Sequence, residues 1–306
     1  MILDHQHTIS CPAFISGIGL HTGVKVTLRL CPAPANTGIV FKRTDLDGFP
    51  IEATARNVAR VSYATSLMKK GVLISTTEHL LSALAAARID NVFAEIDNLE
   101  LPIADGSALP FLKLIHEAGM RKQRATRQYA KVLKPIVVDE GAKRIAVYPS
   151  DIFRISYRIA FLHPMIGEQA LDFEPDREDY ETQIAPARTF GFFEEVEMLR
   201  KSGLVRGGSL ENAVVLTRDG ILNPEGLRFP NEFCRHKVLD SMGDFALLGH
   251  PLVGHVVAER AGHALHIALL TRLLKDKSSW TLADSSELTA SAPSDTPTGV
   301  ATASPA

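Results

Sequence analysis

The order of the predicted elements repeats along the chain, and this repetition constrains the fold more than any other feature of the sequence. Apolar and alternating runs predict strands at residues 8–20, 24–30, 38–42 and 91–96, with helices at 77–88 and 109–118. The second half is predicted to have strands at 130–138, 144–148 and 153–160, then helices at 231–248 and 262–274. Two halves of this kind predict an α+β fold, in which two similar sheet-plus-helix domains pack together.

The boundary between the halves is expected in the basic, polar segment 121–128. A basic run can bind phosphate or a membrane, but we interpret this one as an exposed linker. The expected domains are therefore residues 1–122 and 129–282, with a strand–helix–strand insert at about 192–216 in the second. The tail 283–306 is rich in Ser, Thr, Ala and Pro, so it is expected to be disordered.

Composition limits the class of protein and the cellular compartment that we expect. A chain of 306 residues that is 45% hydrophobic can bury a sizeable core, and a net charge of −2 gives no general attraction to nucleic acid. Its three cysteines show no Cys-x-x-Cys spacing, which argues against a disulfide framework and fits a reducing compartment. There is neither a secretory signal pattern nor an apolar run near the roughly 20 residues of a membrane span. We expect a cytoplasmic monomer without an integral membrane segment.

His236 and Asp240 lie four residues apart in a helical pattern, so both side chains leave one face of the helix. They can close on one metal ion, although a solvated pair has the same spacing. Glu78 and His79 stand together at the start of another predicted helix and are the best additional donors. Acidic residues also favour a helix's first turn, and the order differs from the His-Glu-x-x-His zinc motif. Three protein ligands with an open fourth position would make a catalytic zinc site.

Six short motifs, taken in order, carry a family resemblance. They comprise residues 17–23 (GIGLHTG), 76–80 (TTEHL), 102–111 (PIADGSALPF), 188–192 (RTFGF), 236–240 (HKVLD) and 261–265 (AGHAL). Together they resemble the UDP-3-O-acyl-N-acetylglucosamine deacetylases, zinc enzymes of lipid A biosynthesis. The resemblance extends from about residue 8 to residue 280.

The resemblance implies a role for each residue of the metal site. His79, His236 and Asp240 would bind Zn²⁺, which polarises an amide carbonyl and lowers the pKa of water toward about 7. Glu78 would act as the general base that takes a proton from the attacking water. His263 would act as the general acid that protonates the departing glucosamine nitrogen. Without the resemblance, a structural histidine near a helix start is the favoured interpretation of His263.

Other residues are expected to hold the catalytic groups in place or to contact the substrate. Asp244 follows Asp240 by four residues on nearly the same helical face, and the resemblance implies that it holds His263. Thr189 would donate to the oxyanion of the tetrahedral intermediate. Lys237 is expected to point off the ligand face and to contact substrate, and Phe190 is also assigned to substrate binding. His21 and Asp105 match motif positions without a definite role.

The insert resembles a β-α-β unit that encloses a fatty-acyl chain. The residues expected to line that passage are Phe192, Val196, Leu199, Gly208, Ser209, Ala213 and Val215, with Leu20 facing them from the first domain. Gly208 is expected to leave room for a methylene chain. These positions fit an ordinary core equally well.

The implied reaction is hydrolysis of the N-acetyl group of UDP-3-O-(3-hydroxyacyl)-N-acetylglucosamine, which gives the free amine and acetate. Two alternatives stay open. One is a zinc amidohydrolase that acts on another N-acyl sugar. The other is a metal-free two-domain module that binds nucleotide or RNA.

Overall fold

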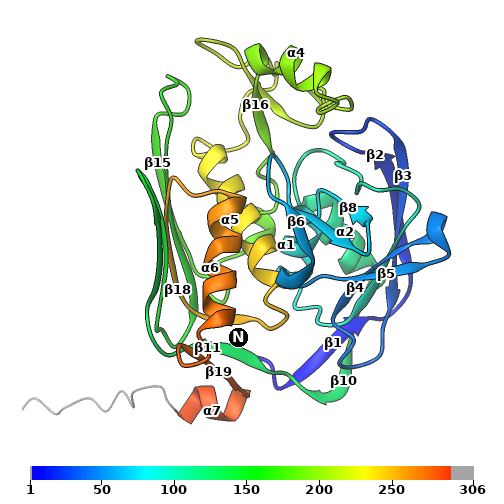
Figure 1. Ribbon diagram of the computed structural model, residues 1–306, viewed down its shortest axis with the longest axis vertical. Coiled ribbons are helices and arrows are strands. Elements are labelled where there is room, and N and C mark those ends of the chain that lie inside the picture. Colours follow the sequence, from blue (N-terminus) through cyan, green and yellow to red (C-terminus); the bar gives the residue numbers. More distant parts are fainter. Residues whose placement is uncertain (1, 291–306) are drawn as a thin grey trace, which may run out of the picture.

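The computed structural model describes residues 2–290, in which two sheets enclose helices packed between them (Figure 1). Helices α1 (Glu78–Ala86) and α2 (Leu109–Ala118) pack together on the side of the first sheet. Helices α5 (Glu232–Ala246) and α6 (His263–Lys275) pack together on the side of the second sheet. Because α1 also packs along α5, the two halves meet through their helices. The predicted α+β fold class is confirmed.

The first half contains a five-stranded sheet in the order β2-β3-β9-β4-β5. Its pairs are antiparallel except β4 and β9, which run parallel. A three-stranded antiparallel sheet, β6-β7-β8, lies beside α1 and carries the chain into it. The strands are β2 (Ala13–Ile18), β3 (Lys25–Pro32), β4 (Ile39–Arg43), β5 (Phe49–Glu52), β6 (Val58–Arg60), β7 (Ser66–Lys69), β8 (Val72–Ile74) and β9 (Val92–Ile96), with 3₁₀ turns at Thr44–Leu46 and Ala55–Asn57.

The second half contains a seven-stranded sheet in which β18 pairs with β11, β13 and β14. Strands β12, β15 and β19 extend it outward from β13, β14 and β11. A four-residue helix, α3 (Tyr180–Gln183), follows β15. The strands are β11 (Tyr129–Val132), β12 (Ile136–Glu140), β13 (Lys143–Tyr148), β14 (Phe153–Ala160), β15 (Glu168–Phe173), β18 (Leu252–Glu259) and β19 (Trp280–Ala283).

The expected insert is a parallel β-α-β unit that projects from one end of the molecule (Figure 1). It consists of β16 (Phe190–Phe192), α4 (Phe193–Lys201) and β17 (Val214–Leu216), so it begins two residues earlier than expected. None of the α4 residues is fully buried, since this helix packs only on one side.

Two segments that were expected to be irregular contain regular structure. Segment 121–128 was expected as a linker, but most of it belongs to β10 (Met120–Thr126), which pairs antiparallel with β1 (His5–Ile9). Arg121, Lys122 and Arg124 of β10 are exposed because a two-stranded ribbon leaves one face open to solvent, whereas Arg127, just after the strand, is buried and pairs with Asp90. In the expected disordered tail 283–306, Ala283 is the last residue of β19 and Ser285–Ala290 form the helix α7, while residues 291–306 lie outside the described residues.

One hydrophobic core runs through both halves. Leu80 and Leu84 of α1 belong to the same buried cluster as Val238 and Leu239 of α5. The two expected domains, 1–122 and 129–282, therefore share one hydrophobic core. Their limits stay predictions. Within the described part of the chain, no helix combines the length and apolar character needed to cross a membrane.

Candidate metal centre and its cavity

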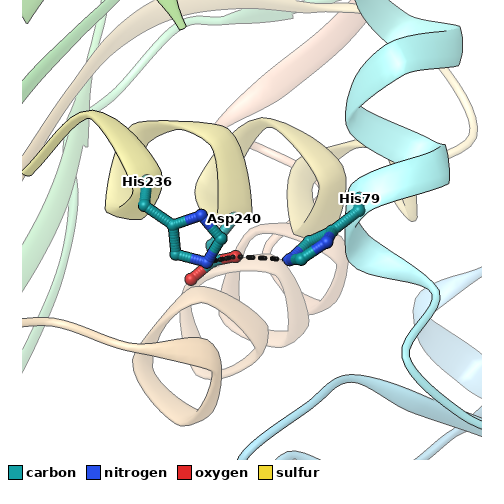
Figure 2. A group of neighbouring side chains, drawn as sticks. All are labelled: His79, His236 and Asp240. Atoms are coloured by element: carbon teal, nitrogen blue, oxygen red, sulfur yellow. Dashed lines mark ion pairs between the residues drawn. The ribbon is translucent and has the colours of Figure 1, made fainter. Parts of the chain in front are cut away.

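The contact between α1 and α5 brings the two predicted halves of the site together. His79 lies in the first turn of α1, while His236 and Asp240 lie one turn apart on α5 (Figure 2). The helices approach closely at Gly243 of α5, which lies against the backbone of α1. The side chain of His79 from the first half can therefore face the same point as those of His236 and Asp240 from the second half.

His79, His236 and Asp240 form a compact group of buried donor atoms. Their ligand atoms lie within 4.8 Å of one another, and no side chain of the three is more than 4% exposed. Asp240 Oδ1 is 3.3 Å from His236 Nε2 and 3.7 Å from His79 Nε2 (Figure 2). The two imidazoles meet edge to face, with ring centroids 5.1 Å apart.

The protonation of this group favours a cation at its centre. His236 Nδ1 donates to the Ala187 carbonyl oxygen at 3.1 Å, so in the neutral ring the Nε2 lone pair faces the Asp240 carboxylate. Burial lowers the pKa of His236, while burial and His236 lower the pKa of His79 to about 3. Neutral imidazoles and an ionised carboxylate are the donor set that Zn²⁺ prefers, so the residues fit the implied metal.

Asp240 stays ionised in this buried position. Burial alone would raise its pKa, but His236 and Lys237 hold the pKa of Asp240 well below its usual range. Lys237 Nζ donates to Asp240 Oδ2 at 2.7 Å. The expectation that Lys237 points off the ligand face was therefore wrong. At a spacing of three residues, its flexible side chain folds back along the helix to the carboxylate.

Glu78 precedes His79 and lies in the same cavity. Burial raises the pKa of Glu78 to about 7. The backbone N–H of Thr65 donates to Glu78 Oε2 at 3.0 Å. This hydrogen bond holds the carboxylate in place beside the His79, His236 and Asp240 group.

His263 begins α6 and pairs with Asp244 on α5. Its Nδ1 is 2.7 Å from Asp244 Oδ2, and its Nε2 lies 3.9 Å from Asp240 Oδ2. Burial opposes the charged imidazole, yet Asp244 and Asp240 raise the pKa of His263 to about 9. The pKa of Asp244 falls to about 2 because the two histidines beside it outweigh its burial. The two carboxylates therefore favour the protonated form of His263.

A cavity of about 340 Å³ opens over these groups. Its lining includes nine of the residues singled out in the sequence: Leu20, Glu78, His79, Thr189, Phe190, His236, Lys237, Asp240 and His263. Thr189 is fixed at the wall because its N–H donates to the Gly106 carbonyl oxygen at 2.8 Å. Asp244 lies behind the wall and reaches the cavity only through His263.

Seven of the residues expected to line an acyl passage lie outside the lining of this cavity. They are Phe192, Val196, Leu199, Gly208, Ser209, Ala213 and Val215, all on or beside the β-α-β insert. The space beside Gly208 is filled rather than open, since a Cβ there would lie 2.5 Å from Val205 Cγ1. The same Cβ position is 3.7 Å from Leu20 Cδ1, so the insert packs against the first half at Leu20.

Two motif residues without an expected role have structural partners. The backbone N–H of His21 donates to Glu100 Oε1 at 2.8 Å. Asp105 accepts from the Ser107 N–H at 3.0 Å and pairs with Arg228 Nη1 at 2.9 Å. Both contacts stabilise loops.

Sequence reasoning missed Thr65 and His266, which contact the functional carboxylates. Thr65 Oγ1 donates to Asp244 Oδ1 at 2.6 Å, and His266 Nδ1 is 2.8 Å from Asp244 Oδ2. Thr65 has no local signal because it reaches Asp244 only through the tertiary fold. His266 gave one weak signal, a second histidine three residues after His263 in a helical pattern.

A buried His₂Asp group beside an acid–base pair in a cavity defines a candidate metallohydrolase centre. The chain matches the sequence model of the LpxC family, UDP-3-O-acyl N-acetylglycosamine deacetylase, over residues 6–275. That match covers most of the chain, so the protein belongs to this family.

Curated relatives agree with the family assignment. The UDP-3-O-acyl-N-acetylglucosamine deacetylase of Solibacter usitatus is 54% identical over 273 residues, which cover 89% of this chain and 92% of the relative. The protein of that name from Syntrophotalea carbinolica is 46% identical, with 92% of each chain covered. The one from Myxococcus xanthus is 48% identical, with 90% of this chain and 88% of the relative covered.

Proposed function

We propose that this protein is a zinc-dependent deacetylase that removes acetate from the glucosamine nitrogen of UDP-3-O-acyl-N-acetylglucosamine. The observation that carries the proposal is the placement of Glu78 and His263 in the same cavity as the His79, His236 and Asp240 group. The names of the relatives support the substrate. A cytoplasmic location and a monomeric state stay predictions.

The metal would be held by His79 Nε2, His236 Nε2 and Asp240. When bound there, Zn²⁺ supplies Lewis acidity to the acetyl carbonyl and makes a water molecule more acidic. Lys237 keeps the Asp240 carboxylate oriented through its 2.7 Å hydrogen bond. The Ala187 carbonyl fixes the His236 ring with Nε2 directed at the group.

Two side chains move protons in the proposed reaction. Glu78 Oε1 accepts a proton from the water as its oxygen attacks the acetyl carbon. His263 then donates its Nε2 proton to the sugar nitrogen as the carbon–nitrogen bond breaks, because an amine anion is too poor a leaving group. Asp244 holds the His263 ring through Nδ1 and stabilises its charge. The Thr189 hydroxyl donates to the developing oxyanion.

Substrate contacts are assigned to the walls of the cavity and to the insert. Leu20 and Phe190 offer apolar surface near the metal ligands, and Phe190 packs edge-on against Phe233 with centroids 4.9 Å apart. We assign the acyl chain to a path from there along the insert. Lys237 lies at the cavity wall and is assigned to substrate oxygens.

A comparison of two UDP sugars tests the proposal. The 3-O-acylated UDP-N-acetylglucosamine should release acetate, whereas UDP-N-acetylglucosamine without the acyl chain should react far more slowly. Equal rates would favour an amidohydrolase that acts on another N-acyl sugar. If neither sugar reacts and purified protein holds no metal, a metal-free binding module becomes the better interpretation.

A further inference from the structure

The Asp244 carboxylate has a second imidazole partner that the proposed reaction does not use. His266 Nδ1 lies 2.8 Å from Asp244 Oδ2, the same oxygen that His263 Nδ1 approaches at 2.7 Å. His266 stands one turn after His263 on α6 and is fully buried. It does not belong to the cavity lining, so it touches Asp244 without reaching the substrate.

Tyr157 on β14 fixes the other side of the His266 ring. The Tyr157 hydroxyl is 2.9 Å from His266 Nε2. Burial raises the pKa of Tyr157 well above its usual value, so the hydroxyl keeps its proton and can donate it. Because Nε2 then accepts, the ring proton is on Nδ1 and points at Asp244.

Aromatic neighbours pack against the His266 ring. Tyr157 meets it edge to face, with centroids 5.9 Å apart and planes at 81°. Phe245 packs against it with centroids 5.7 Å apart. Together with the hydrogen bond from Tyr157, this packing favours the ring orientation in which Nδ1 faces Asp244.

Asp244 is consequently held by three side chains, which come from two parts of the chain. His263 and His266 of α6 approach Oδ2, while Thr65, which precedes β7, donates to Oδ1 at 2.6 Å. In a buried network with every donor and acceptor paired, a carboxylate keeps a single orientation. Removing one donor leaves buried polar atoms unpaired and allows the others to rearrange.

We propose that His266 is a positioning residue for this reaction. Its Nδ1–H, oriented by Tyr157, fixes the Asp244 carboxylate in the orientation that directs His263 Nε2 into the cavity. The inference rests on the proposed function, because its consequence is expressed in catalysis. His266 itself neither binds substrate nor exchanges a proton with it.

Two substitutions at residue 266 separate the hydrogen bond from the packing. His266→Leu fills similar space without a donor. His266→Asn places an amide N–H near the position of the imidazole Nδ1, so it can still donate to Asp244. His7→Leu is the matched control, since His7 is another buried histidine but lies on β1 outside the network.

The experiment measures kcat, KM and metal content for the wild type and these variants. His266→Leu should lower kcat by about 10- to 100-fold with KM and metal content unchanged, as is typical when a carboxylate–imidazole support is lost. His266→Asn should recover most of kcat, and His7→Leu should retain it. A His266→Leu enzyme with wild-type kcat would overturn the inference. So would equal losses in the Leu and Asn variants, because packing alone would then explain both.

A double-variant cycle tests the role of Tyr157. Tyr157→Phe removes the donor to His266 Nε2 and should lower kcat severalfold in the wild type. In His266→Leu the same change should have little further effect, because the two residues act through one contact. Additive losses would show that Tyr157 does not act through His266.

A proton NMR readout keeps the inference separate from the proposed function. Two hydrogen-bonded imidazole N–H groups buried at Asp244 should give slowly exchanging downfield signals in the wild type. His266→Leu should remove one signal and shift the other. If the wild type does not hydrolyse the UDP sugar but the signals behave this way, the proposed function fails while the His266–Asp244 contact stands. If the second signal does not shift, His266 does not position the pair.

Discussion

Gly243 on α5 lies directly against the backbone of Glu78 on α1. A Cβ atom at Gly243 would be 2.0 Å from the Glu78 carbonyl oxygen, closer than any real contact allows. Only glycine lets the helices cross at this distance. The same crossing brings His79 to His236 and Asp240 of α5, so one missing side chain sets the geometry of the candidate metal group.

Gly243→Ala should therefore destabilise the protein and weaken metal binding. The added methyl group meets backbone, which cannot yield like a flexible side chain, and overpacking of this kind costs about 1–3 kcal/mol. Urea unfolding measures the loss, and metal analysis should show a lower content. Gly220→Ala is the control, because its nearest neighbour would be Thr217 Oγ1 at 3.5 Å. A Gly243→Ala protein with unchanged stability and metal content would contradict this account of the crossing.

Glu78→Gln should remove most turnover and leave the metal in place. The amide cannot take a proton from water, and a general base typically contributes about 10²- to 10⁴-fold. Metal content and kcat are measured together, with Glu117→Gln on the exposed side of α2 as control. Loss of metal along with activity would make Glu78 a ligand or a structural residue instead.

The rate should depend on pH in a bell shape. Activity needs Glu78 ionised and His263 protonated, and their pKa values are raised to about 7 and about 9. As the pH increases, the rate therefore rises when Glu78 loses its proton and falls when His263 loses its proton. A dication at the adjacent ligands would move both limbs toward lower pH.

His263→Ala identifies the group behind the falling limb. Removing the imidazole should depress kcat/KM and abolish the fall at high pH, because no protonated donor is then lost. Profiles of kcat/KM against pH for the wild type and the variant make the comparison. A falling limb that survives in His263→Ala would assign it to another group.

The C-terminal helix should contribute to stability and not to catalysis. Leu288 of α7 is buried with Tyr129 and Val253, far along the chain from the metal ligands. Leu288→Ala should lower the free energy of unfolding by about 2 kcal/mol and leave kcat unchanged. Thr289→Ala, at an exposed position, is the control. A fall in kcat without a loss of stability would link α7 to the site.

Local sequence signals predicted the parts of the fold and site that depend on local geometry. Helix α2 has the predicted bounds, 109–118, and the four-residue spacing of His236 and Asp240 places both on one face of α5. Short strands such as β6 and β8 were missed because three residues are too few to show a period.

The other features of the site depend on tertiary contacts, which local sequence patterns do not show. His79 reaches His236 and Asp240 only because α1 packs against α5. Residue spacing therefore could not group His79 with these two residues, and the grouping came from the family resemblance. Lys237 was placed wrongly because helix periodicity fixes the direction of Cβ and not of a flexible four-carbon side chain. Thr65 reaches Asp244 across 179 positions of sequence, a contact that no local pattern predicts.

Titration of metal-depleted protein with Zn²⁺ tests the central claim most directly. Bound metal and acetate release from UDP-3-O-acyl-N-acetylglucosamine are followed in the same samples. The proposal predicts that both rise together and saturate at about one equivalent per chain, and that His79→Ala shows neither rise. Acetate release that persists undiminished after metal removal would contradict a zinc-dependent deacetylase.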